Sequence, residues 1–258
     1  MAIAFESSGA VTYGINSITP VIDAAQTTDA MMLLIVGGKP FDSAWTVSGW
    51  TSAGRGQSGT TVAGVDTGSM ALEVFWKIAA ADPETNPTVT EGTPAWNVVG
   101  AWVMTFTKAA NETWSTPTAV YGADEVTGTA VSATMSADNN VAVNDFIVTL
   151  LATNTDAMGP YPTDITAAQT GVTFANYSTR TDSVSSSGGD MSLNARTANI
   201  TGGPSSAAAV LTATGAASGG ADKSEAGYVR LRVTAAVSGP IIAAHANRML
   251  QSQLSQVW

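Results

Sequence analysis

The sequence repeats a short structural plan once along its length, and this repetition constrains the fold more than any other feature. In the first half, an apolar run at 31–36 is followed by Gly49-Trp50-Thr51, a Gly/Ser/Thr-rich loop at 52–69 and a second apolar run at 70–76. Similar segments return in the same order in the second half. The pairs are 31–36 with 145–151, 49–51 with 171–174, 68–72 with 189–193 and 100–106 with 227–233, the last three at offsets of 122, 121 and 127 residues. Such self-similarity predicts a duplicated structural unit.

The apolar residues of these segments follow the period of β-strands. The run at 31–36 is continuous between turn signals, which is typical of a strand covered on both faces. From Met70 to Ile78 the side chains alternate, with Glu73 and Lys77 on the second face, which predicts a strand with one wetter face. Thr and Val are common, and Gly or Pro recurs at short intervals, as in β-sandwiches. We therefore predict an all-β protein of two tandem, pseudo-repeated antiparallel β-sandwich units, jelly-roll-like in type, at 1–114 and 115–238.

The segment 239–258 breaks the strand pattern and is predicted to be a C-terminal α-helical tail. Gly239-Pro240 ends the sheet, and proline suits the first turn of a helix. Beyond it, apolar residues recur every three or four positions, which indicates an amphipathic helix. A helix of this length is unstable alone, so we expect it to dock on its own sandwich or on a neighbouring subunit, and we favour the neighbour. The residues expected to make this contact are Ile242, Ala246, Leu250, Leu254, Val257 and Trp258.

The charge balance argues against several classes of partner. The net charge is −10, whereas nucleic-acid binding needs a cationic surface, and an anionic membrane would repel the chain as well. We expect no secretory leader and no membrane span, because no apolar run approaches the ~20 residues that a span requires. Charged residues make up 12% of the chain, about half the usual share, which suits either a protein buried in an assembly or a β protein with a neutral surface. Arg230 and Arg232 alternate with apolar residues, which predicts a polar face that is solvated or forms an interface.

Residues with catalytic or metal-binding chemistry are sparse, and the chain has no cysteine. The only histidine, His245, lies on the predicted helix, and no nucleophile elbow, P-loop or dinucleotide motif occurs. We therefore expect no enzyme activity, no cofactor and no metal. The Asx-rich stretch at 138–145 has oxygen ligands of the kind that Ca²⁺ prefers, with an Asx turn as the favoured alternative. Trp45, Trp50 and Trp114 would favour sugar binding if they are exposed in loops, whereas core packing is the commoner fate of tryptophan.

The buried run at 31–36, the Gly49-Trp50-Thr51 turn, the small-residue loop and the ending Phe75-Trp76-Lys77 resemble the β-sandwich structural proteins of tailed-phage virions. The second half departs from this pattern in having Val172 instead of the tryptophan. The resemblance implies a non-enzymatic protein of the virion, assembled in the host cytoplasm, and most directly a capsid decoration or cement protein. Such a protein would form a homo-oligomer and bind major capsid or tail proteins through sheet edges and the terminal helix. The alternatives are a minor tail or tail-associated protein, a carbohydrate-binding adhesin module, and a glycan-cleaving enzyme with two facing carboxylates.

Overall fold

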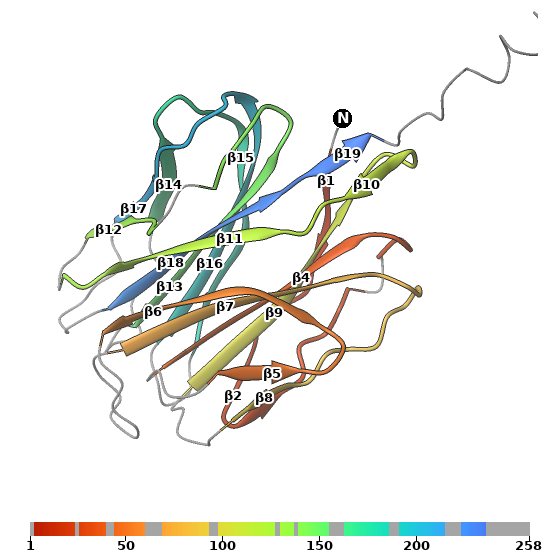
Figure 1. Cartoon of the computed structure of the whole chain (residues 1–258). Coiled ribbons are helices and arrows are strands. Elements are labelled where there is room, and N and C mark those ends of the chain that lie inside the picture. Colours follow the sequence, from red (N-terminus) through yellow and green to blue (C-terminus); the bar gives the residue numbers. More distant parts are fainter. Residues whose placement is uncertain are drawn as a thin grey trace, which may run out of the picture.

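Every regular element that the structure describes is a β-strand (Figure 1). The structure is a computed structural model. It describes residues 3–23, 26–39, 44–59, 69–92, 98–126, 130–136, 139–154, 163–185, 191–214 and 223–235. All pairings between the strands are antiparallel, so the prediction of an all-β protein with antiparallel sheets is confirmed. No helix within the described ranges is long and apolar enough to span a membrane.

The first half of the chain builds one large sheet and one small sheet. The first main sheet has the strand order β1-β9-β4-β7-β6, and β2 also pairs with β9. The small sheet has the order β3-β8-β5. The strands are β1 (Ala4–Ser8), β2 (Thr12–Gly14), β3 (Ser17–Ile18), β4 (Met31–Lys39), β5 (Trp45–Val47), β6 (Thr51–Gly59), β7 (Ser69–Ile78), β8 (Val89–Glu91) and β9 (Val98–Thr107).

The second half builds a corresponding pair of sheets. The second main sheet has the order β11-β18-β13-β16-β15, and its small sheet has the order β12-β17-β14. A separate two-stranded ribbon, β10-β19, joins the end of the first half to the last described strand. The strands are β10 (Glu112–Trp114), β11 (Thr118–Asp124), β12 (Ala130–Thr134), β13 (Phe146–Asn154), β14 (Thr163–Gln169), β15 (Thr173–Val184), β16 (Met191–Gly202), β17 (Ala209–Thr214), β18 (Ser224–Leu231) and β19 (Val233–Ala235).

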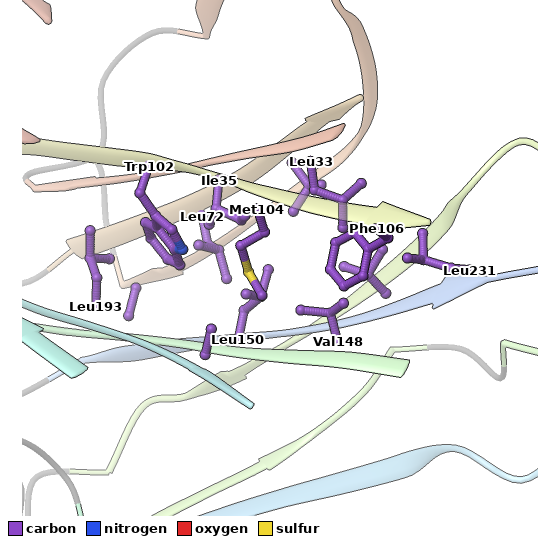
Figure 2. Close-up of a cluster of buried hydrophobic side chains, with 14 of the residues drawn as sticks. Leu33, Ile35, Leu72, Trp102, Met104, Phe106, Val148, Leu150, Leu193 and Leu231 are labelled. Carbon is purple, nitrogen blue, oxygen red and sulfur yellow. The ribbon is translucent and has the colours of Figure 1, made fainter. Parts of the chain in front are cut away.

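The four sheets stack in layers, with the two main sheets in the middle and a small sheet on each outer side. The largest core lies between the main sheets, where Leu33 and Met104 of the first half meet Val148 and Leu231 of the second (Figure 2). A second core lies between the first main sheet and β3-β8-β5, and a third lies between the second main sheet and β12-β17-β14. The central strands of both main sheets are therefore covered on both faces, whereas the edge strands β6 and β15 are partly exposed along most of their length.

This layering explains which strand predictions hold. All residues of β4 and of β13 are buried, as expected for continuous apolar runs covered on both faces. The alternation in β7 is also present, because Leu72 and Val74 belong to the central core and Ala71 and Phe75 to the outer one. The wetter face predicted for β7 is wrong, since the small sheet covers that face.

Two further expectations, on the Gly-rich stretch and on the cores of the two halves, need correction, and the predicted tail lies outside the described residues. The Gly-rich stretch that we expected to be a loop begins as strand β6 (Thr51–Gly59), paired with β7. We also expected each half to bury its own core, whereas the largest core is shared between the halves. The tail at 239–258, with its predicted contact residues Ile242, Ala246, Leu250, Leu254, Val257 and Trp258, lies outside the described residues. The bounds of the two predicted units stay a prediction.

Candidate functional site

A groove of about 440 Å³ lies where the edge strand β6 of the first main sheet passes over β11 and β18 of the second. Its position follows from two glycines of β6. A Cβ on Gly56 would lie 2.5 Å from the Cβ of Tyr121 and would also overlap Glu225 Oε1. A Cβ on Gly54 would lie 3.2 Å from Cε2 of Tyr121. The missing side chains therefore let the two sheets approach closely along this edge, and the groove forms beside the contact.

The most unusual group of the groove is the carboxyl of Glu225. The residue is 1% exposed, and its Oε2 accepts no hydrogen bond from the described residues. Burial, together with a smaller contribution from the charge of Glu125, raises the pKa of this carboxyl to about 8. Desolvation disfavours the charged form of an acid, so the group is mostly neutral at pH 7. The groove thus has a buried carboxylic acid at its base.

Tyr121 closes the groove and links its two walls. Its hydroxyl donates a hydrogen bond to the carbonyl oxygen of Gly54 at 2.5 Å, which ties β11 to β6. Burial raises the pKa of the Tyr121 hydroxyl, and the charges of Glu73 and Glu225 add to the effect. The hydroxyl therefore stays protonated at neutral pH and acts as a fixed hydrogen-bond donor.

A second buried carboxyl, Glu73, lies on the opposite face of the first main sheet. Its neighbours in β7, Ala71 and Phe75, belong to the outer core, and its Oε1 accepts a hydrogen bond from Ser52 Oγ at 2.8 Å. Burial raises the pKa of Glu73, while Ser52 and the nearby Arg55 guanidinium lower it. Because the sheet separates Glu73 from the groove, the described lining contains a single carboxyl, Glu225. The described lining of the groove therefore offers a single hydrogen-bonding acid rather than the facing pair of carboxylates that glycoside hydrolysis uses.

The Asx-rich stretch that we considered for a cation is occupied by arginines of the same chain. Arg232 binds the Asp145 carboxylate through two hydrogen bonds, Nε to Oδ1 and Nη2 to Oδ2, both at 2.6 Å. Arg232 Nη2 also donates to the carbonyl oxygen of Asn140 at 2.9 Å, and Arg230 Nη1 donates to that of Asn139 at 2.5 Å. Charge-assisted, two-pronged bonds of this kind are strong. The alternating arginines therefore hold their own loop, and Asp138 lies outside the described residues.

The three tryptophans considered for sugar binding are not displayed at loop tips. Trp45 is 3% exposed, and its ring lies 4.9 Å below the guanidinium carbon of Arg55. Trp50 packs against the outer core, and Trp114 packs against the central core while its Nε1 donates to the carbonyl oxygen of Asp29. Core packing, the alternative that we gave for these residues, holds for Trp45, while Trp50 and Trp114 are partly buried against the edges of the cores.

The last candidate residue from the sequence, His245, lies outside the described residues. The groove beside β6 was not predicted from the sequence. Within the ranges that the structure describes, no three His, Cys, Asp or Glu side chains are grouped as a metal site would need. Glu225 carried one usable signal, because in β18 it shares the inward face with Val229 and Leu231.

Compared with family models, with curated proteins and with solved structures, the chain shows no significant match.

Proposed function

We propose that this protein is a non-enzymatic structural component of a tailed-phage virion, most directly a capsid decoration protein that binds neighbouring subunits. The observation that carries the proposal is that the central strands of both main sheets are buried on both faces. A sandwich that binds a ligand on a sheet face needs that face to be open. Here the partly exposed edge strands β6 and β15 are left for interaction, and sheet edges are suited to attaching other proteins.

The proposal includes a tandem duplication of one jelly-roll-like unit. The strand order β9-β4-β7-β6 in the first main sheet corresponds to β18-β13-β16-β15 in the second, and β3-β8-β5 corresponds to β12-β17-β14. Gly49 and Gly171 precede the corresponding strands β6 and β15 with φ angles of 76° and 79°. These are left-handed conformations that glycine adopts without strain.

The contacts between the two halves support the same idea, because they are reciprocal. The position of a Cβ on Gly227 in β18 is 3.1 Å from Leu72 Cδ2 of the first half. In the other direction, the position of a Cβ on Gly100 in β9 is 2.6 Å from Leu193 Cδ1 of the second half. Leu72 and Leu193 belong to the segments paired by the repeat, as do Gly100 and Gly227. Such a self-complementary contact is typical of a two-fold symmetric dimer, so we infer that the chain is a dimer joined into one polypeptide.

The experiment follows this protein into particles made by the genome that encodes it. A tagged full-length chain should co-purify with heads that have been separated from tails. Replacing Leu250 and Leu254 by alanine removes two residues of the predicted apolar stripe and should abolish incorporation, with folding checked by circular dichroism. Replacing Gln251 and Gln256, which lie off the stripe, is the matched control and should have no effect.

Three outcomes separate the parts of the proposal. Recovery with tails instead of heads would favour the minor tail alternative over decoration. Complete absence from purified particles would overturn the virion assignment. Normal incorporation of the leucine variant would leave the virion assignment in place but refute docking through the tail.

A further inference from the structure

The groove beside β6 contains an acid that the described part of the chain leaves without a hydrogen-bond partner. Glu225 of β18 lines the groove and is 1% exposed, and its Oε2 receives no hydrogen bond from the described residues. Buried polar groups are nearly always hydrogen-bonded, because leaving the bond unmade costs free energy. A buried carboxyl that lines a groove and lacks such a bond is therefore a candidate ligand-binding group.

Two cations of the chain lie near this carboxyl, and both have other contacts. Lys223, two residues before Glu225, has its Nζ 3.1 Å from Glu125 Oε2 and donates to the carbonyl oxygen of Glu125 at 2.6 Å. Arg55 lines the groove, but its guanidinium lies over the ring of Trp45 in the outer core. The charge that acts on Glu225 is the negative charge of Glu125. These surroundings favour the neutral acid over its carboxylate.

The other ionisable groups around the groove also leave the acid uncharged. The Tyr121 hydroxyl of β11 donates to the carbonyl oxygen of Gly54 and stays protonated. The carboxylate of Asp124, on the same strand, accepts hydrogen bonds from two backbone N–H groups. Glu73 lies on the far face of the first main sheet. Among the described residues, none of these groups offers Glu225 a positive charge.

We propose that the groove binds a primary carboxamide group through Glu225. A neutral carboxyl has one O–H donor and one carbonyl acceptor, and a primary carboxamide has a carbonyl acceptor and N–H donors in the matching order. The two groups can therefore exchange two hydrogen bonds. An ammonium ligand would require the buried acid to ionise, which desolvation disfavours. A carboxylate ligand would meet the negative charge of Glu125.

The walls of the groove suit a small, uncharged ligand. A Cβ on Gly56 would lie 2.1 Å from Glu225 Oε1, so it is the glycine that leaves room beside the carboxyl. Ala119 and Val120 of β11 also line the groove and can contact the carbon chain of a ligand. The volume of about 440 Å³ accommodates an amide with several carbon atoms. The site rests on the geometry of the groove and does not depend on the proposed function.

The test is an NMR titration of the full-length protein, followed through the methyl groups of Ala119 and Val120. Butyramide should shift these signals at pH 6.5, whereas butyrate and butylammonium at the same concentration should not. N,N-dimethylbutyramide, which lacks the N–H donors, should bind about fivefold more weakly because one hydrogen bond is lost. No shift with butyramide, or tighter binding of butylammonium, would overturn the proposal.

The pH dependence tests whether the neutral acid is the binding group. The pKa of Glu225 is about 8, so the acid is mostly protonated at pH 6.5 and mostly ionised at pH 9. The affinity for butyramide should therefore fall about tenfold between these two values, with the fold checked by circular dichroism. An affinity that is constant or rises with pH would refute the role of Glu225.

Three variants locate the site. Glu225→Gln keeps a donor and an acceptor in the same place, so it should retain binding and lose the pH dependence, and loss of binding in this variant would count against the proposal. Glu225→Ala should abolish binding. Glu84→Gln, the matched control, changes a carboxyl that pairs with Lys77 and does not line the groove, and it should behave as the wild type. If Glu225→Ala does not fold, the pH profiles of the wild type and Glu225→Gln decide the question.

A second probe identifies the source of the carboxamide. Acetylglutamine methylamide carries the group on an amino-acid side chain, whereas butyramide carries it on a plain carbon chain. Tighter binding of the glutamine probe would support the site and assign the ligand to a protein side chain. Tighter binding of butyramide would support the site and assign it to a small amide.

Discussion

At the scale of single residues, the buried carboxyl of Glu225 makes stability depend on pH in an unusual direction. Its pKa is about 8 in the folded protein against an ordinary value of 4.5. Between these two values the folded chain holds a proton that the unfolded chain has released. The free energy of unfolding therefore falls as pH rises through this range, and the full loss above pH 8 is roughly 5 kcal/mol.

We expect Glu225→Gln to remove this dependence, because the amide fills the same space and never ionises. The variant should match the wild type at about pH 4 and be more stable at pH 9 by up to roughly 5 kcal/mol. Thermal unfolding followed by circular dichroism across this range measures the difference. Equal sensitivity of the two proteins to alkaline pH would show that the carboxyl is not buried as described.

The ion pair between Arg232 and Asp145 gives a second prediction at this scale. The side chain of Asp145 is 2% exposed, so Arg232→Ala would leave a buried carboxylate without its main partner. Breaking such a pair costs about 3 to 5 kcal/mol. Lys223→Ala, which breaks a pair whose glutamate side chain is 52% exposed, should cost under about 1 kcal/mol. Urea denaturation compares the two variants, and similar losses would contradict the special role of Arg232.

At the scale of elements, the close approach of β6 to the second main sheet depends on glycine. Gly56→Ala would place a methyl group against Tyr121 and Glu225. Overpacking of this kind costs about 1 to 3 kcal/mol. Gly49→Ala meets no atom within 4 Å but has a φ of 76°, so it pays only the left-handed backbone cost of about 1 to 2 kcal/mol.

Single and double variants distinguish steric overlap at Gly56 in β6 from backbone strain at Gly49, which precedes that strand. In Gly56→Ala, adding Glu225→Ala should recover part of the stability, because it removes one of the two overlapping side chains. In Gly49→Ala, the same second change should recover nothing. Denaturant midpoints of the single and double variants are the measurement. If the losses in free energy of unfolding caused by Gly56→Ala and by Glu225→Ala simply added in the double variant, the predicted overlap between residues 56 and 225 would be refuted.

At the scale of the whole molecule, the shared core predicts that both halves unfold together. Leu72 and Leu193 lie in opposite halves but in the same core. Replacing either by alanine should cost about 2 to 5 kcal/mol, and each change should lower one common transition. Calorimetry should show a single peak with equal calorimetric and van't Hoff enthalpies. Two peaks, of which each variant shifts only one, would mean that the halves are independent.

The sequence by itself determined the secondary-structure class and the positions of the central strands. The continuous run at 31–36 and its counterpart at 145–151 predict strands buried on both faces, because strands with no polar face have to be covered twice. The segments that the predicted repeat pairs lie in or next to strands of the two main sheets, and the duplication itself stays a prediction. These are local signals, carried by the period of apolar residues along a strand.

Only the tertiary structure decided what covers each face and which polar groups meet. The Gly-rich stretch at 51–59 has no strand-like side-chain pattern, yet pairing with β7 and contact with Tyr121 make it an edge strand. The period of its strand places Glu225 on an inward face, but neither the residues that surround it nor the contact of Lys39 with Asn154 can be read from the sequence, since those partners are far away along the chain. Burial and proximity depend on how sheets stack, and the period of a strand specifies which residues share a face but not what lies opposite that face.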